Sequence, residues 1–332
     1  MFNGESKLSV ETRKIQRTTD GTCLVSLPKN WVKRFNLKKG SLLYVRERAD
    51  GCLVLDPQYT VDVSPETTIK ASKRLEDDIL SSYLLGYEVV VIEAPKLTAE
   101  FKERIKHAVN RLVGVEIIEE DDHRVVLQCL LKPTAFPPEK ILRREYVLSL
   151  SLFKDVFNSF ISTDFKLAKT LPERDEEIDR LYFLLVRLLR SLILNPRLSE
   201  KLNISLIDCL DYRLIASLVE NIADRAVEMA NFIVQMNNYK LPPEIKEQAK
   251  KVGEELQATY EEVVKAIFSK DEKILMSAIQ KREEAEKNLK KLEENMDKEK
   301  NLDSRLTYTF LSFVHRVLDH LKDMMDLVTT IR

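Results

Sequence analysis

The chain has 332 residues, of which 44% are hydrophobic, 32% are charged and only 7 are glycine. This composition excludes a disordered chain and favours a mostly helical protein of two or three domains. No N-terminal basic segment leads into an apolar run, and no uncharged apolar stretch reaches about 18 residues. We therefore expect a soluble, cytoplasmic protein that is not embedded in a membrane. The four cysteines are widely separated and predict neither a disulfide framework nor a zinc knuckle.

Charge is distributed unevenly along the chain, although the formal net charge is only −1. Residues 1–57 contain eleven Lys or Arg and six Asp or Glu, a net +5, which leaves −6 for the remainder. Such asymmetry indicates a small basic module joined to a larger acidic body.

The basic module, residues 1–57, has the pattern of two hairpins separated by a short helix. The dipeptides Asp20-Gly21 and Asp50-Gly51 are typical of tight turns between paired strands. A proline at position 28 suits the first turn of a helix. Strands are predicted at 13–18, 22–27, 42–46 and 52–55, and the helix at 28–35.

This order of elements resembles the swapped-hairpin DNA-binding domain of the AbrB/MazE type. The resemblance is carried by residues 26–31 (SLPKNW) and 37–41 (LKKGS), although Ser41 stands where that family usually has an acidic residue. In the family two chains interleave into one barrel, and the first hairpins lie against DNA. The resemblance therefore implies a homodimer that binds duplex DNA. Trp31 follows Pro28 on the short helix between the hairpins and is expected to be a core or dimer-interface anchor. The implied DNA contacts are Arg13, Lys14 and Arg17, followed by Lys29, Lys33 and Arg34.

An alternative for the module is dimerisation alone, with its basic residues as ordinary solvated charge. A net charge of +5 is modest for a DNA-binding domain. Both interpretations are kept open at this stage.

Residues 58–135 predict a small α/β unit of unassigned role. Gly86 and Gly114 are isolated, so the unit contains no glycine-rich nucleotide loop. Glu120-x-x-His123 has the spacing of a di-iron ligand pair, but it falls in a predicted turn and is interpreted as a solvated hairpin tip. Strands are predicted at 67–71, at 88–93 and on both sides of 120–123, and helices at 73–85 and 98–113.

Residues 139–332 predict a tandem of two three-helix bundles, one at 139–240 and one at 241–332. Asn195-Pro196 and the prolines at 242 and 243 supply breaks between helices. The whole chain is accordingly expected to have an α+β fold that is predominantly α. Helices are predicted at 139–163, 170–194, 204–236, 243–269, 271–299 and 303–331.

An internal repeat marks this helical half. The segment 162–167 recurs 107 residues later as 269–274, and each copy precedes an acidic helix and a paired carboxylate motif. These motifs are Glu220-x-x-x-Asp224 and Asp319-x-x-x-Asp323. Carboxylates four residues apart lie one turn apart on a helix, where they repel unless a cation or solvent intervenes. Metal binding is therefore predicted at both motifs.

Residues 175–179 (DEEID) and 218–226 (LVENIADRA) resemble the acidic motifs of the PhoU family, a tandem of three-helix bundles. This resemblance implies a regulator of phosphate uptake, not an enzyme, that acts with phosphate transporter components or a sensor kinase. It also implies bound iron, zinc, manganese or magnesium, and oxygen ligands favour the hard ions among these. The implied ligands are Asp175, Asp179, Glu220 and Asp224 in the first bundle, and Glu286, Asp319 and Asp323 in the second.

The second metal site is expected to be the weaker one. Arg282 stands at the repeat position of Asp175, and its guanidinium is expected to pair with Asp319 or Asp323. Histidines 315 and 320 neighbour this motif and are expected to be structural. The pairs Glu173/Glu177 and Glu293/Asp297 have the same four-residue spacing and are interpreted as solvated faces.

Two alternative functions remain open on the sequence alone. One is a dimeric adaptor that acts on a membrane transporter without binding DNA. The other is a carboxylate-bridged di-metal enzyme, although neither third helix of a bundle carries the Glu-x-x-His motif of such enzymes.

Overall fold

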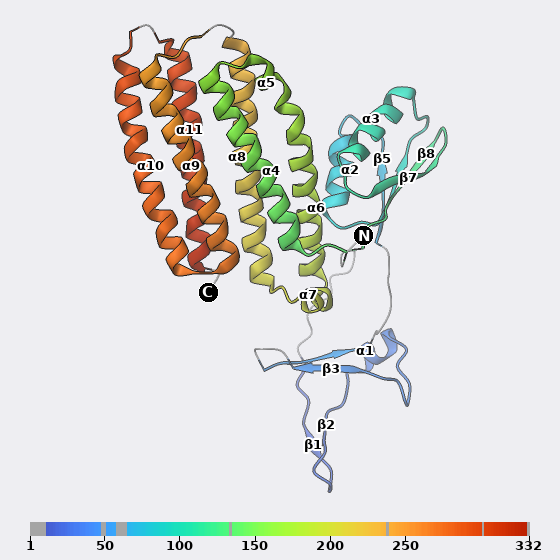
Figure 1. Ribbon diagram of the computed structural model, residues 1–332. Coiled ribbons are helices and arrows are strands. Elements are labelled where there is room, and N and C mark those ends of the chain that lie inside the picture. Colours follow the sequence, from blue (N-terminus) through green and yellow to red (C-terminus); the bar gives the residue numbers. More distant parts are fainter. Residues whose placement is uncertain are drawn as a thin grey trace. The chain divides into compact units, whose positions relative to one another are not determined.

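The computed structural model describes residues 11–47, 51–57, 65–132, 135–236, 239–300 and 302–330 (Figure 1). The chain divides into two compact units, Met1–Val63 and Ser64–Arg332. We call the described part of the first unit the N-terminal module. The second unit contains an α/β region, 65–132, and a helical region, 135–330.

Two antiparallel strand pairs and one helix form the N-terminal module. In the first hairpin the Thr18 N–H donates to the Thr22 carbonyl at 2.9 Å, and Gly21 has a φ of +90°, as the predicted turn requires. Asp50 of the second predicted turn lies outside the described residues. The strands are β1 (Gln16–Arg17) with β2 (Cys23–Leu24) and β3 (Tyr44–Glu47) with β4 (Leu53–Asp56), and the helix is α1 (Lys29–Arg34).

Among the side chains of this module whose burial the structure describes, none is buried. Ile15, Leu42 and Leu53 are 71%, 81% and 66% exposed, respectively. Trp31 is half-buried and packs edge-on against Phe35, with ring centroids 5.5 Å apart. Apolar strands without a core gain little stability from burial, because burial of apolar surface is what stabilises a small domain.

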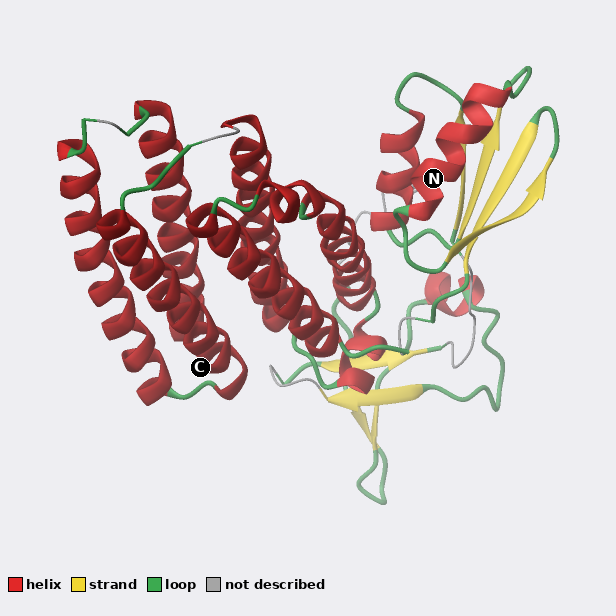
Figure 2. Ribbon diagram, turned by 45° about the horizontal axis from the view of Figure 1, so that its top comes forward, coloured by secondary structure: helices red, strands yellow, loops and turns green. Residues whose placement is uncertain are grey.

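The α/β region has a four-stranded sheet in the order β5-β6-β8-β7, and two helices pack against it (Figure 2). Strands β5 and β6 are parallel and are joined by α2, whereas β8 runs antiparallel to both of its neighbours. The order of strands and helices is the predicted one. The elements are β5 (Glu66–Lys70), α2 (Leu75–Leu84), β6 (Val89–Glu93), α3 (Ala99–Asn110), β7 (Val115–Glu120) and β8 (Arg124–Cys129).

The β7–β8 turn is an exposed hairpin tip, as predicted. The Asp121 carboxylate accepts hydrogen bonds from the backbone N–H groups of His123 and Arg124, each at 2.7 Å. Glu120 and His123 are both exposed. Their spacing therefore reflects turn geometry rather than a metal site within a bundle.

The helical region is the predicted tandem of three-helix bundles, and the two bundles share one apolar core. Phe157 of the first bundle lies 5.7 Å from Phe310 and 5.6 Å from Phe313 of the second, measured between ring centroids. Within the described residues, no helix combines the length and the apolar character needed to cross a membrane. The first bundle contains α4 (Pro138–Ser162), α6 (Asp175–Leu194) and α8 (Leu206–Met236), and the second contains α9 (Pro243–Ser269), α10 (Glu272–Lys298) and α11 (Ser304–Thr330).

Three short helical segments differ from the prediction. The helix predicted at 170–194 begins with a 3₁₀ turn at Pro172–Arg174 and continues as α6 from Asp175, and an additional short helix, α5 (Phe165–Thr170), precedes it. Proline has no N–H to continue a helix from the preceding turn, so Pro172 starts a new segment. The predicted break at Asn195-Pro196 likewise begins α7 (Pro196–Leu202), with proline in the first turn.

The two copies of the sequence repeat have the same local structure, in which one helix ends and the next begins. Thr163 and Lys270 end their helices in the left-handed conformation, with φ of 58° and 53°. Asp164 and Asp271 follow, and their carboxylates accept backbone N–H hydrogen bonds at the start of α5 and α10. The repeat therefore fixes equivalent turns in the two bundles.

Candidate metal centre

Four predicted carboxylates of the first bundle converge from α6 and α8. Asp175 and Asp179 lie one turn apart on α6, and Glu220 and Asp224 lie one turn apart on α8; all four are partly buried. Asp175, Asp179 and Asp224 each place one carboxylate oxygen so that the three atoms lie within 4.8 Å of one another. We call these three residues the acidic triad.

Local sequence explains why these acids can come together. Asp175 is the first residue of α6, where free backbone N–H groups favour negative charge. On α8 the small residues Ala223 and Ala226 are fully buried, and Ile178 of α6 is fully buried as well. Small buried residues let helix backbones approach closely, so carboxylates beside them are held near one another.

Burial raises the pKa of every acid in this group, and repulsion between the acids adds to the rise at Asp175, Glu220 and Asp224. Desolvation, followed by the charges of Asp179 and Asp224, raises the pKa of Asp175 to about 7. Desolvation, followed by Asp224 and Asp179, raises the pKa of Glu220 to about 7. The pKa of Asp224 is raised mainly by burial. Negative charge is therefore costly here unless protons or cations offset it.

A fifth carboxyl group, which the sequence did not reveal, belongs to the same region. Glu145 of α4 is completely buried, and neither of its oxygens has a hydrogen-bond partner among the residues that the structure describes. Burial raises the pKa of Glu145 well above its usual value, and the charge of Glu220 raises it further. The sequence contained one sign that Glu145 faces inward. It lies four residues from Ile141 and from Ser149, both of which are buried, and this spacing places all three on the inner face of α4.

The donor set fits a hard metal ion. All five side chains offer carboxylate oxygen, which magnesium, manganese and iron accept readily, and no histidine or cysteine takes part. Glu145 and the buried Oδ1 of Asp175 have no donor in the described structure, so both have capacity to bind a cation. The acidic triad would hold such an ion, and the charges of Glu220 and Glu145 would lie near enough to influence it.

The second bundle does not bring its predicted ligands into a comparable group. Glu286, Asp319 and Asp323 are all exposed. The expected pairing of Arg282 with Asp319 or Asp323 is wrong, because Arg282 instead binds Glu286 on its own helix at 3.3 Å. Residues four apart on a helix are neighbours, so Arg282 reaches Glu286 more easily than an acid on another helix. Across the described residues, the acidic triad is the one group of three potential ligands.

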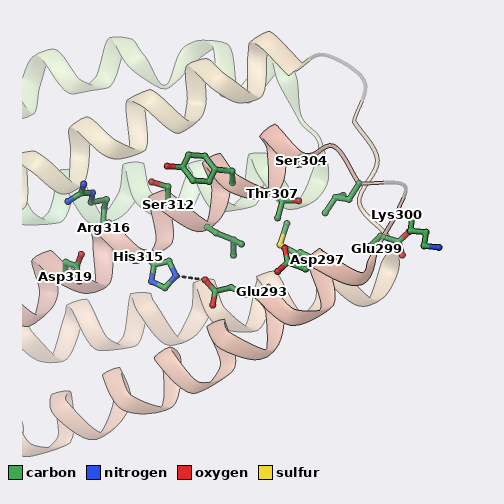
Figure 3. Close-up of a pocket in the computed structure, with 14 residues that line it drawn as sticks. Glu293, Asp297, Glu299, Lys300, Ser304, Thr307, Ser312, His315, Arg316 and Asp319 are labelled. Carbon is green, nitrogen blue, oxygen red and sulfur yellow. Dashed lines mark hydrogen bonds and ion pairs between the residues drawn. The ribbon is translucent and has the colours of Figure 1, made fainter.

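A cleft of about 760 Å³ lies between α10 and α11 of the second bundle (Figure 3). Nε2 of His315 is 2.5 Å from Oε1 of Glu293, so these two side chains join the helices. Acidic and basic residues both line the cleft, including Asp297, Arg316 and Asp319. His320 lies outside the lining of this cleft; it is half-buried, and desolvation lowers its pKa. This cleft carries mixed charge and differs from the all-carboxylate group of the first bundle.

The six basic residues predicted to contact DNA are exposed on the N-terminal module. Arg13 forms an ion pair with Glu11, and Arg17 lies on β1. Their exposure leaves them accessible to a nucleic acid. Lys14 adjoins the first hairpin, and Lys29, Lys33 and Arg34 belong to α1.

Comparisons with known proteins bear on the helical region. Residues 142–233 match the PhoU domain family, and this segment contains Glu145, the acidic triad and Glu220. The crystal structure of PhoU from Pseudomonas aeruginosa is similar to this chain at 18% identity and a TM-score of 0.51. The alignment covers 57% of this chain and 93% of that one, and at this identity it shows a shared fold alone. No curated protein matches the chain.

Proposed function

We propose that this chain is a cytoplasmic, dimeric regulator of phosphate uptake, in which a metal-binding bundle is joined to a DNA-binding module. The PhoU domain at residues 142–233 supports the regulatory role. The observation that carries the proposal is the acidic triad, because partly buried carboxylates with raised pKa values lie within that domain. A regulator of this kind would act on phosphate transporter components or a sensor kinase rather than catalyse a reaction.

The metal would serve to neutralise and order the first bundle. Two carboxylates from α6 and two from α8 repel one another when ionised, and a divalent cation between them would draw the helices together. Manganese, magnesium and iron suit the oxygen donors best. Binding would release whatever protons these acids hold at neutral pH, so metal affinity would rise with pH.

Metal binding is tested by titrating the full-length metal-free chain with manganese in a calorimeter. We expect saturable binding that the variant Glu220→Gln with Asp224→Asn abolishes. The control is Glu173→Gln with Glu177→Gln, which changes an acidic pair of the same spacing outside the acidic triad. Equal binding by all three proteins would reject the site.

A link to phosphate is tested in cells of the source organism that lack the gene. Phosphate uptake would be measured after complementation with the wild-type chain or with Glu220→Gln, Asp224→Asn. We expect the wild-type chain, but not the variant, to restore normal control of uptake. Unchanged uptake in the deletion strain would reject the phosphate role.

The N-terminal module is proposed to form a dimer that binds duplex DNA. Its exposed apolar strands and missing core support completion by a second copy. Substituting Trp31 by Ala in the full chain should shift the protein from dimer to monomer in light scattering. A dimeric Trp31→Ala protein would place the interface elsewhere.

DNA binding is tested with Arg13→Ala and Arg17→Ala combined, compared with Lys38→Ala and Lys39→Ala as a control of equal charge. The first pair should weaken duplex binding and reduce its salt slope by roughly one for each lost phosphate contact. The control should retain most of the affinity. If the wild-type chain shows no salt-dependent binding, the adaptor that acts on a transporter without DNA becomes the better account.

A further inference from the structure

One face of α6 joins the acidic triad to the α/β region. Asp179, Phe183 and Arg187 are spaced four residues apart, so they lie along the same side of the helix. Phe183 packs against the core of the α/β region, and Arg187 is only 7% exposed. Figures 1 and 2 both show α6 as the bundle helix beside this region.

Arg187 forms the buried part of this contact. Its Nη1 donates to the carbonyl oxygens of Tyr83 at 2.6 Å and Tyr87 at 2.9 Å. The guanidinium also lies 4.8 Å from the centroid of the Tyr83 ring. Buried charge-assisted hydrogen bonds of this kind hold the end of α2 against α6.

Arg111 forms the second and more exposed part of the contact. It follows α3 directly, and its Nη2 donates to Oδ2 of Asp179 at 3.2 Å. Its guanidinium also lies 5.6 Å from the centroid of the Phe183 ring. The side chains of Arg111 and Asp179 are 45% and 24% exposed, so solvent can reach this ion pair.

Asp179 therefore serves two partners at once. It belongs to the acidic triad, and it is also the carboxylate that binds Arg111. A divalent cation in the triad would repel the guanidinium and withdraw negative charge from the shared carboxylate. Metal and Arg111 thus compete for the same anion.

We propose that Arg111 is a built-in competitor of the metal, so that metal binding at the acidic triad releases the α3 side of the α/β region from α6. This proposal rests on the metal site proposed above and adds its regulation. Arg187 keeps the α2 side attached while the Arg111 contact opens and closes. Coupling is reciprocal: whatever holds the α/β region against α6 also weakens metal binding.

The first test measures manganese affinity by calorimetry in full-length variants. Arg111→Gln should bind manganese about fivefold more tightly than the wild-type chain, at the lower end of typical coupling because the pair is half exposed. Arg111→Lys keeps the charge and should resemble wild type. Lys106→Gln is the matched control, since it removes one positive charge from α3 whose partner, Glu103, lies on the same helix. It should leave the affinity unchanged.

The second test follows amide hydrogen exchange with and without manganese. In the wild-type chain, exchange at residues 108–115 should increase when manganese binds, whereas the α2–β6 turn at residues 83–87 should stay protected. In Arg111→Gln, the exchange at 108–115 should already be fast and should not respond to the metal.

The outcomes separate this proposal from the metal site itself. If the wild-type chain binds manganese, and Glu220→Gln with Asp224→Asn abolishes that binding, the site stands. Unchanged or weaker affinity in Arg111→Gln, or equal gains in Arg111→Gln and Lys106→Gln, would then overturn the coupling alone. A wild-type chain that binds no manganese would overturn both.

Discussion

The two bundles share a repeat, a helix order and a paired acidic motif, yet their acids lie in different surroundings. In the first bundle Asp175, Asp179 and Asp224 are partly buried and close together. In the second, Asp319 and Asp323 are exposed, and Arg282 neutralises Glu286. Four-residue spacing alone therefore does not bring acids together in a partly buried group; the convergence of two helices does.

The first helices of the two bundles, α4 and α9, also differ at equivalent positions. At the repeat offset of 107 residues, Glu145 of α4 corresponds to Val252 of α9, and both positions are buried. Val252 is the ordinary choice for an interior position, whereas a carboxyl without a partner destabilises a core. The first bundle thus contains a costly polar group beside its acids, which is typical of functional sites.

The largest contrast is expected in metal affinity. Glu220→Gln with Asp224→Asn should weaken manganese binding by at least about 100-fold, because losing even one outer-shell partner often costs 10–100-fold. Asp319→Asn with Asp323→Asn should change it little. Calorimetry on both double variants checks this. Similar losses in the two proteins would remove the asymmetry between the bundles.

The next contrast is the pH dependence of the metal-free protein. Asp175 and Glu220 have folded-state pKa values of about 7, above those of the unfolded chain. Their protonation favours the folded state, so this contribution is fully present below about pH 4 and is lost as pH rises towards 7. After allowance for partial exposure, the loss should be on the order of a few kcal/mol.

Urea unfolding at pH 5 and pH 8 measures this effect. The free energy of unfolding of the wild-type chain should fall across this interval more steeply than that of Glu220→Gln with Asp224→Asn. Saturating manganese should reverse the trend in the wild-type chain, since the ion stabilises the ionised acids. An equal change of the free energy of unfolding with pH in both metal-free proteins would show that burial does not raise the pKa values of these acids.

Substituting Glu145 should separate stability from metal binding. Glu145→Met replaces an unpartnered carboxyl by an apolar side chain of similar length. It should raise the free energy of unfolding of the metal-free protein by about 1–3 kcal/mol, the usual cost of an unsatisfied buried polar group. The same variant should bind manganese more weakly in calorimetry. A destabilised variant with unchanged metal affinity would mean that Glu145 has only a structural role.

The smallest effect is expected from restoring the missing acid of the second bundle. Arg282→Asp frees Glu286 from its ion pair and recreates the repeat position of Asp175. We expect a weak second binding event, because exposed carboxylates are well hydrated. The variant should be made together with Glu220→Gln and Asp224→Asn, so that the first bundle does not contribute manganese binding. No added manganese binding would show that position 282 does not decide the asymmetry.

The sequence predicted the order of the elements and the two helices that carry the acids, because apolar periodicity and proline breaks are local signals. It also predicted, through their motifs, that Asp175, Asp179 and Asp224 lie close together. It missed Glu145, because this residue stands among charged residues at 143–145, and its spacing of four residues from Ile141 was the one weak signal that it faces inward. It gave the wrong partner for Arg282, since helix-surface pairing competes with contacts between helices.

The contacts of Arg111 and Arg187 were also beyond sequence reasoning. Both depend on how the α/β region packs against α6, and no local pattern encodes that geometry. The repeat did indicate the equivalent turns at Thr163 and Lys270, because an Asp that caps the next helix follows each.

Anomalous diffraction from crystals grown with manganese tests the central claim most directly. The account predicts a strong anomalous peak among the carboxylates of Asp175, Asp179 and Asp224, with Glu220 and Glu145 turned towards it. No peak of comparable height should lie at Asp319 and Asp323. Peaks of equal height in the two bundles, or one peak only in the cleft beside Glu293 and His315, would contradict it.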